Sequence, residues 1–194
     1  MKKGSYSREE YLRRLKSFHG SLAPGLIIGG FMVELAVKSL PEDILFDAIC
    51  ETPACLPDAI QLLTPCTVGN GWLTVLNIGR FAITLYEKYH GAGIRVYLDP
   101  AKLENYPEIK AWYYKLKPKS EQNFQLLIEQ IQEAEDRILG LQHVKVQPEL
   151  VRRKRIGPVA TCPRCGECYP LRDGDCCLAC QGAAPYLELR TEPS

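Results

Sequence analysis

The sequence has almost no net charge, few histidines and no long apolar segment. Among its 194 residues, 24 lysines and arginines stand against 23 aspartates and glutamates, so the formal charge is +1 at pH 7. This balance gives no overall field that would draw the chain to nucleic acid or to a membrane surface. The longest apolar run, residues 22–33, is shorter than the ~20 residues that span a bilayer, and one proline and three glycines interrupt it.

Targeting and cofactor segments are also lacking. The first 14 residues turn polar directly after two lysines and have no apolar stretch, so we expect no secretory signal and a cytoplasmic location. The turn at residues 69–71 is too short to cradle a phosphate, and nothing resembles a pterin- or flavin-binding loop. Of the three histidines, His90 and His143 fit a turn and a strand edge, which leaves His19 as a candidate for chemistry.

Helical and extended patterns are both present. A capping box, Ser7-x-x-Glu10, predicts a helix that ends at His19. Pro24 suits the first turn of a second helix that runs to about Lys38, and its small apolar interior predicts close packing inside the core.

A strand predicted at residues 44–51 is followed by alternating runs at residues 72–77, 80–86 and 94–98. The breaks between these three runs are typical of hairpins. The sequence therefore predicts an α+β fold, with a mostly antiparallel sheet packed with helices.

Two more helices are expected in the next segment. The first covers residues 107–115, and Ser120 is predicted to cap the second. Apolar residues recur along the second helix at helical spacing, and Gly140 is a natural stop. Residues 143–149 are short and β-prone.

Six of the nine cysteines lie between Cys162 and Cys180. Without a secretory signal, Cys-x-x-Cys pairs favour a metal site over disulfides. Cys162 with Cys165, and Cys177 with Cys180, form two such pairs, separated by 11 residues. Four thiolates in tetrahedral geometry are the preferred environment of structural zinc, and a module too small to bury a core should fold only with its metal.

A basic run at residues 152–155, followed by Gly157-Pro158, marks the predicted domain boundary. Residues 1–150 form the expected α+β core domain. Residues 151–194 hold a basic linker and a small C-terminal zinc-finger module, similar to a zinc ribbon. Such a short basic run is usually a solvated linker, and contact with nucleic acid is the alternative.

Cys168 and Cys176 are surplus to a four-ligand site, and each could replace a neighbouring cysteine if the register shifted. An iron–sulfur cluster is the alternative to zinc, because the first three tail cysteines are spaced as in a ferredoxin. Arg172, however, stands where the fourth cysteine of that motif is expected, so zinc is favoured. A closed site of four thiolates leaves no position for substrate and is structural.

The core has its own cysteine pair, because Cys55 and Cys66 bracket a helix-like segment and a glycine-rich turn follows. Together with His19 they would suit zinc or a similar transition metal. Asp58 and Gln61 could orient a ligand there or simply hydrogen-bond locally. The other interpretation is that both cysteines pack as small hydrophobes.

Two motifs in the core carry a family resemblance. Cys-x-x-Asp-Ala-Ile-Gln begins at Cys55 and is followed by Thr-x-Cys-Thr-x-Gly; residues 18–25 read Phe-His-Gly-Ser-Leu-Ala-Pro-Gly. These motifs and the tail cysteines resemble the FmdE family, the E-type subunits of formylmethanofuran dehydrogenase. The likeness covers roughly residues 18–96 and 161–181. Where that family has a second histidine and a cysteine, this chain has Ser21 and Ala23.

The resemblance implies a homodimer of interlocking chains, with residues 24–37 and the helical segment after Asp99 as the expected interface. It leaves His19, Cys55 and Cys66 of the family's core constellation. The preferred hypothesis is a metal-binding accessory or regulatory protein whose structural zinc module contacts a protein or nucleic-acid partner. The alternative is an enzyme, or a component of one, related to formylmethanofuran dehydrogenase, with a second transition metal in the core.

Overall fold

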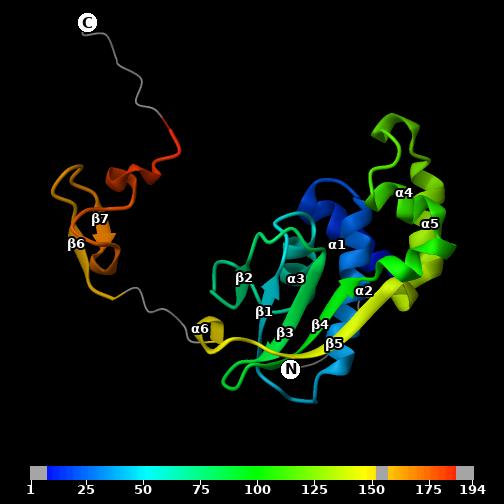
Figure 1. Ribbon diagram of the computed structural model, residues 1–194, viewed down its shortest axis with the longest axis horizontal. Coiled ribbons are helices and arrows are strands. Elements are labelled where there is room, and N and C mark those ends of the chain that lie inside the picture. The colour runs from blue at the N-terminus through cyan, green and yellow to red at the C-terminus, as the bar shows by residue number, and fades with distance from the viewer. Residues whose placement is uncertain (1–7, 152–156, 187–194) are drawn as a thin grey trace, which may run out of the picture. The chain divides into compact units, whose positions relative to one another are not determined.

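The computed structural model describes residues 8–151 and 157–186 (Figure 1). By internal contacts the chain divides into two compact units, Met1–Val151 and Arg152–Ser194. Ser7 of the predicted capping box and the basic run at residues 152–155 lie outside the described residues. No helix in the described parts of the chain is both long and apolar enough to cross a membrane.

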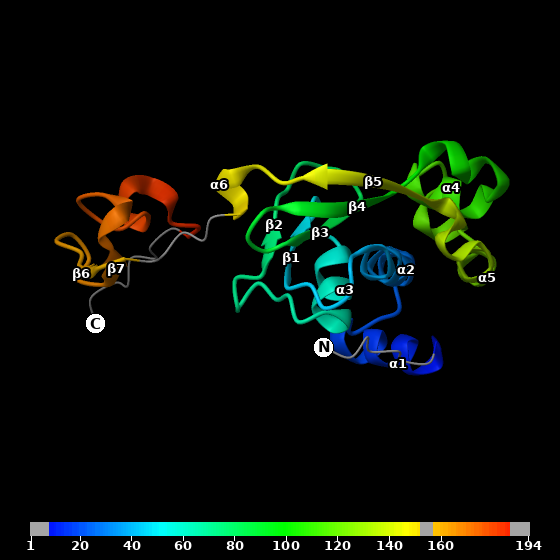
Figure 2. The same cartoon turned by 90° about the horizontal axis from the view of Figure 1, so that it is seen from below.

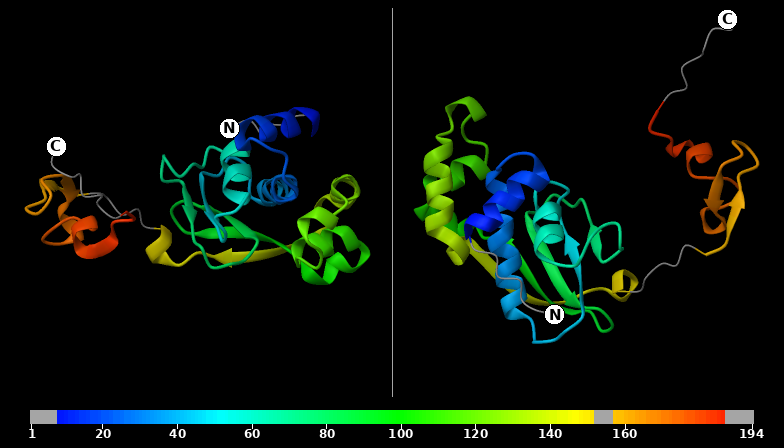
Figure 3. Two further views of the ribbon diagram at one scale, coloured as in Figure 1. Left: turned by 90° about the horizontal axis from the view of Figure 1, so that it is seen from above. Right: turned by 180° about the vertical axis from the view of Figure 1, so that it is seen from behind.

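In the first unit, three helices lie on one face of a five-stranded sheet, as Figure 2 and Figure 3 show from below and from above. They are α1 (Arg8–His19), α2 (Pro24–Ser39) and α3 (Leu56–Leu63). The middle helix, α2, packs on both the sheet and α3, and more than half of its residues are buried. The prediction of a buried helix from Pro24 is confirmed.

Glycines let the neighbouring helices approach α2. A Cβ at Gly29 would lie 2.9 Å from the Cβ of Ala59 on α3, and a Cβ at Gly30 would lie 2.2 Å from the Tyr11 hydroxyl on α1. The Tyr11 hydroxyl donates a hydrogen bond to the Leu26 carbonyl of α2 (2.9 Å), and burial raises its pKa. Glycine is unfavourable inside a helix by about 1 kcal/mol relative to alanine, and these close contacts offset that cost.

The sheet has the order β2–β1–β3–β4–β5. Its strands are β1 (Phe46–Cys50), β2 (Leu73–Val75), β3 (Ala82–Glu87), β4 (Ala92–Leu98) and β5 (Leu139–Lys145). Three of the four strand pairs are antiparallel, and the pair β1–β2 is parallel. The predicted α+β fold with a mostly antiparallel sheet is confirmed.

The hairpin predicted between residues 72–77 and 80–86 is wrong. β1 lies between these two segments, so Ile49 pairs with Thr74 in parallel and with Thr84 in antiparallel orientation. After β2 the chain follows the end of β1 instead of turning tightly, and the Ile78 N–H donates to the Glu51 carbonyl (3.3 Å). Alternation identifies a strand, but it does not say which strand lies beside it. The second predicted hairpin, β3 with β4, is present.

Two helices, α4 (Pro107–Tyr113) and α5 (Phe124–Ala134), lie beyond the ends of β4 and β5 (Figure 1). The prediction that Ser120 caps the longer helix is wrong, because Asn123 is its N-cap. The Asn123 side-chain oxygen accepts a hydrogen bond from the Leu126 N–H (3.1 Å). Ser120 lies in a separate short helical turn, Lys119–Glu121.

The predicted stop at Gly140 is also wrong. The α-helix ends at Ala134, and Glu135 follows with a positive φ of 50°. Gly140 is instead part of β5, opposite Tyr97 on β4, where a Cβ would lie 2.3 Å from the tyrosine ring. The glycine is therefore required by a close cross-strand contact, and the last strand begins earlier than the predicted residues 143–149.

The opposite face of the sheet carries a smaller apolar cluster of Ile49, Tyr86 and Val146, against which Leu76 and Val151 pack. The last of these residues belongs to the short helix α6 (Pro148–Val151). In the second unit, β6 (Val159–Thr161) and β7 (Cys168–Pro170) form a two-stranded antiparallel sheet.

Candidate metal centre

The first cysteine pair of the second unit lies in the turn that joins β6 and β7. The Cys162 N–H donates to the Glu167 carbonyl (2.8 Å), and the Gly166 N–H donates to the Cys162 carbonyl (2.9 Å). The chain turns back at Gly166, whose φ of 78° would strain any residue with a side chain. The glycine after the pair is thus explained by the backbone.

The second cysteine pair opens a helical turn, Ala179–Ala183. The Gln181 side-chain amide donates to the carbonyls of Asp173 (2.7 Å) and Cys176 (2.6 Å), which ties this turn to the connecting loop. The turn expected at Asp173-Gly174 is present: Gly174 has a φ of 112°, and its carbonyl accepts a hydrogen bond from the Tyr169 hydroxyl (3.0 Å).

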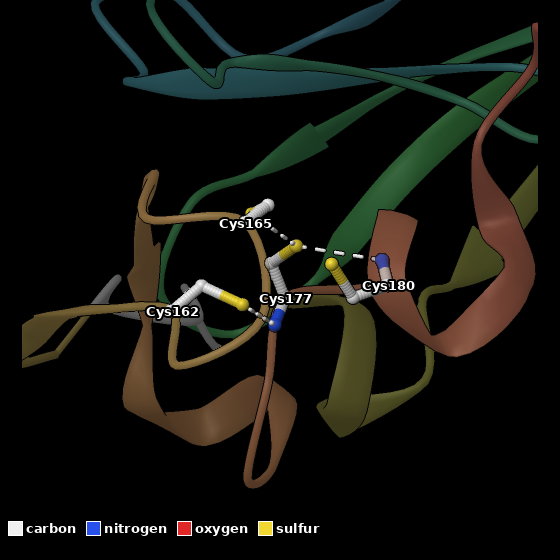
Figure 4. A group of neighbouring side chains, drawn as sticks. All are labelled: Cys162, Cys165, Cys177 and Cys180. Atoms are coloured by element: carbon white, nitrogen blue, oxygen red, sulfur yellow. Dashed lines mark hydrogen bonds between the residues drawn. The ribbon is translucent and has the colours of Figure 1, made fainter. Parts of the chain in front are cut away.

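The two turns bring four sulfur atoms together (Figure 4). The Sγ atoms of Cys162, Cys165, Cys177 and Cys180 all lie within 4.8 Å of one another. The sulfurs of Cys165 and Cys177 are 3.6 Å apart. Four thiolates at about 2.3 Å from a tetrahedral zinc ion are about 3.8 Å from one another, so the donor set and its spacing fit zinc.

Backbone amides favour negative charge at this cluster. The Cys177 N–H donates to the Cys162 sulfur (3.5 Å), and the Cys180 N–H donates to the Cys177 sulfur (3.4 Å). The N–H groups of Cys177 and Cys165 lower the pKa of the Cys162 thiol to about 6. Hydrogen bonding to the sulfurs of Cys177 and Cys165 raises the pKa of Cys180 to about 12. Four crowded sulfurs cannot all ionise by themselves, and a divalent cation removes that conflict.

The surplus cysteines do not join the four-sulfur group. Cys168 is exposed on β7, and Cys176 is buried beside Tyr169 in the small cluster that packs this unit. The ligand set is therefore two C-x2-C pairs, and the spacing of a ferredoxin is not reproduced in space.

The core candidates lie apart from one another. His19 ends α1, and its Nδ1 atom is 2.6 Å from a carboxylate oxygen of Asp58 in the first turn of α3. Both side chains are partly exposed. A carboxylate at this distance fixes the orientation of an imidazole ring, so the partner of Asp58 in this structure is His19.

Cys55 is the N-cap residue of α3 and has an unusual backbone conformation, φ 58° and ψ −52°. The Leu56 N–H donates to the Ala54 carbonyl (2.6 Å), which closes a γ-turn around the cysteine. Its sulfur packs on α2, where a Cβ at Gly25 would lie 3.0 Å away. Burial, and then the nearby Asp58, raise the pKa of this thiol, so the protonated form is favoured at neutral pH.

Cys66 is fully buried after the other end of α3, and its thiol donates to the Phe46 carbonyl (3.6 Å). Burial raises its pKa to about 11, as expected of a cysteine that packs as a small hydrophobe. The Gln61 side chain accepts a hydrogen bond from the Val68 N–H (3.2 Å) and so orders the turn before β2.

The structure thus pairs His19 with Asp58 but does not gather His19, Cys55 and Cys66 into one ligand set. Among the described residues, the four tail cysteines form the one group of three or more metal-binding side chains that converge. Of the two substituted motif positions, Ser21 is exposed, and Ala23 is the N-cap of α2 without a side-chain hydrogen bond.

Sequence reasoning missed a charged cluster on the sheet. Glu51 follows β1 and is almost completely buried, and it forms ion pairs with Arg95 (2.6 Å) and Arg80 (2.7 Å). The signal was available in the sequence. A glutamate that closes an apolar strand and an arginine inside another both break the expected pattern, because charged residues are rarely buried unless they are paired.

Fold and site define a class: an α+β core joined to a small four-cysteine zinc module. Residues 18–146 match the family described as "FmdE, Molybdenum formylmethanofuran dehydrogenase operon", and residues 153–187 match the "FmdE treble clef zinc finger". The chain belongs to the FmdE family, and its tail is a zinc finger in which the four cysteines hold a structural zinc ion.

Two similar proteins are informative. The crystal structure of a tungsten formylmethanofuran dehydrogenase FmdE-like protein from Syntrophus aciditrophicus is 55% identical, with a TM-score of 0.86 over 94% of this chain and 96% of that one. A protein from Archaeoglobus fulgidus described as a probable S-adenosyl-L-methionine-binding protein is 31% identical over 89% of this chain. The present chain spans about half the length (52%) of that relative.

Proposed function

We propose that this FmdE-family protein is an accessory or regulatory protein whose zinc module contacts a protein partner. The observation that carries the proposal is the closed four-sulfur cluster: all four ligand positions of a tetrahedral zinc are supplied by the chain. A metal in such a site has no position for a substrate, so its role is to fold the module and its surface.

The surface of the module supports a protein partner over nucleic acid. Among residues 157–186 there are two arginines and three acidic residues, so this part of the chain offers no positive patch for phosphates. It does expose large apolar side chains. These are Val159, Leu171, Leu178 and Tyr186. Exposed apolar groups on a small module are typical of protein contacts.

Metal content tests the first half of the proposal. We expect about one zinc ion per intact chain, by elemental analysis, and none in a truncation that ends at Val151. A metal retained by the truncated chain and lost on His19→Ala or Cys55→Ala would instead favour the alternative, an enzyme with a core His/Cys metal site.

Co-purification tests the second half. A Leu171→Ser, Leu178→Ser double variant keeps all four cysteines, so we expect unchanged zinc content but loss of the protein partners identified by mass spectrometry with the intact chain. The same partners with the double variant would contradict the proposal. Strong, salt-dependent binding to RNA, measured by fluorescence anisotropy, would indicate the nucleic-acid alternative.

We also propose that the protein is a homodimer, with α4 and α5 at the interface. The segment that joins and begins these helices exposes large apolar side chains in the single chain. These are Tyr114, Leu116, Phe124 and Leu126. In sedimentation equilibrium, we expect a dimer for the intact chain and a monomer for Leu116→Ser with Phe124→Ser. Leu45→Ser, at an exposed apolar residue elsewhere, is the matched control.

A second candidate function is binding of S-adenosylmethionine, which the description of the Archaeoglobus relative suggests. A groove of about 400 Å³ lies between α1, α2 and the end of α5, within the size range of small-molecule sites. Phe31, Glu34 and Asp136 are among its lining residues, and carboxylates would favour the positive sulfonium and ammonium groups. Calorimetry with this ligand, compared between the intact chain and Phe31→Ala, tests the candidate; equal affinities would contradict it.

A further inference from the structure

A second hollow, of about 300 Å³, lies on the sheet face opposite α2. Its floor includes a row of side chains in register across four strands. They are Ile49, Thr84, Arg95 and Gln142. The neighbouring positions Ala48, Leu85 and Ile94 face the main core instead, so the row and the core occupy opposite faces.

A buried carboxylate organises the charges of this hollow. The side chain of Glu51 is 5% exposed, and Arg95 binds both of its oxygens, through Nε (2.6 Å) and a terminal nitrogen (2.9 Å). The Arg80 Nε contacts the same carboxylate at 2.7 Å. Burial opposes ionisation of Glu51, but the two arginines hold its pKa below the usual range. The carboxylate is therefore charged at neutral pH and fixes both guanidinium groups.

Positive charge exceeds negative charge in this hollow. Two guanidinium groups share one carboxylate, and the exposed Lys145 adds a further positive charge to the lining. Glu51 is the one acidic side chain among the described residues that line the hollow. Arg95 also donates to the Gln142 side chain (2.9 Å), whereas Arg80 keeps 62% of its side chain exposed. The accessible guanidinium is thus that of Arg80, held at the rim by Glu51.

The wall beside this charge is apolar. Ile78 is 53% exposed, and Leu150 of α6 is also exposed. Both line the hollow, as do Leu76, Val144 and Val146. A free anion such as chloride would use the charge but leave the wall in water, whereas a molecule with an apolar tail would cover it.

We propose that this hollow binds a small organic monocarboxylate with an apolar tail. The planar carboxylate matches the two-pronged donor geometry of an arginine, and the excess of positive charge favours an anion. The tail would lie along Ile78 and Leu150, where a second charged group would lose its hydration. This site is separate from the zinc module, and the proposal is independent of the accessory role.

Hexanoate is a suitable probe, with acetate, hexan-1-ol and hexylamine as matched compounds. Titration of the full-length, zinc-loaded chain by calorimetry and by amide NMR shifts should show saturable binding of hexanoate. We expect hexanoate to bind more tightly than acetate and the other two compounds not to saturate. Shifts should be centred on residues 78–80 and 144–150.

Variants separate charge from apolar contact. Arg80→Gln should weaken hexanoate binding about tenfold, because it removes a charge-assisted hydrogen bond at an exposed position. Arg13→Gln, at an exposed arginine on α1, should leave binding unchanged. Ile78→Ser should reduce the preference for hexanoate over acetate without abolishing acetate binding.

The proposal is overturned if hexan-1-ol binds as well as hexanoate, or if Arg80→Gln binds hexanoate with unchanged affinity. Absence of saturable binding, together with a change of sedimentation coefficient in Arg80→Gln, would also overturn it and would identify this face as a contact between copies of the chain.

Discussion

The two units of this chain are held together by different means. In the first unit, 24 buried residues form one continuous apolar cluster between the sheet and its helices. In the second, the buried apolar cluster consists of Cys162, Tyr169, Cys176 and Cys177, of which two are zinc ligands. Burial at ~25 cal/mol per Å² can stabilise the first unit, but so few residues cannot offset the chain entropy of the second.

Cysteine shows the same contrast on a smaller scale. Cys66 in the first unit is fully buried, and burial raises the pKa of its thiol to about 11. Cys162 in the second unit is also buried, yet backbone N–H groups lower its pKa to about 6. Burial of a cysteine therefore does not decide its role; the direction of the surrounding amide groups does.

Zinc removal should separate the two units most clearly. Chelation, or Cys177→Ala, should abolish folding of the second unit, because the apparent free energy of binding a structural zinc, about 10–16 kcal/mol, is also its folding free energy. Hydrogen exchange measured by mass spectrometry should show full loss of protection in residues 157–186 and none in residues 8–151.

Cys66→Ala is the matched control in the other unit. It should retain one zinc ion per chain and destabilise the first unit by about 1–2 kcal/mol in urea unfolding, because it leaves a small cavity. Cooperative loss of both units on chelation would show that the comparison is drawn too sharply.

The largest effect expected within the first unit comes from its helix contacts. Gly30→Val should lower the free energy of unfolding by about 3 kcal/mol, because the new side chain would overlap the Tyr11 ring and push α1 away from α2. Urea unfolding followed by circular dichroism measures this loss. Gly69→Ala, where the nearest atom lies 4.0 Å from the added carbon, is the control and should change stability by less than about 0.5 kcal/mol.

Acid should weaken the first unit through Glu51. Because arginines lower its pKa in the folded chain, the unfolded chain takes up this proton first. The stabilisation is complete above the ordinary carboxyl pKa of 4.5 and is lost as pH falls through the folded value. Glu51→Gln should therefore cost about 2 kcal/mol at pH 7 and progressively less in acid, by urea unfolding across pH.

Glu104→Gln provides a comparison at an exposed ion pair with Lys110. Such surface pairs contribute at most about 1 kcal/mol, so this variant should be nearly neutral at every pH. An equal loss in both variants would mean that the buried position of Glu51 is unimportant.

Much of the fold could be predicted from local patterns. The buried helix from Pro24, the strands and the mixed helix-and-sheet class all follow from periodicity and small residues. Strand order could not be predicted in this way, because insertion of β1 between β2 and β3 depends on contacts distant in sequence. The prediction for Gly140 failed for a related reason: a glycine at a helix end and a glycine facing Tyr97 look alike in one sequence.

The two candidate sites differed in how far sequence could place them. In the tail, each C-x2-C pair is a single local turn, so spacing alone names the four residues that converge. In the core, Cys55 and Cys66 lie at opposite ends of α3, and their directions depend on α2 and β1. The pairing of His19 with Asp58 joins residues 39 positions apart, which no local spacing indicates.

The smallest expected effect sharpens the comparison inside the zinc module itself. Cys168→Ser changes a cysteine two residues beyond the first knuckle's glycine, but its side chain is exposed and lies outside the four-sulfur group. Zinc content and affinity, measured by competition with a chromophoric chelator, should stay within about twofold of the unmodified chain, whereas Cys165→Ser should lose most of its zinc affinity. Equal losses in the two variants would mean that the register of the first pair can shift and that Cys168 replaces Cys165 as a ligand. An unchanged Cys168→Ser would place the whole metal-binding free energy in the two C-x2-C turns, with the remaining tail cysteines acting only through packing and solvent contact.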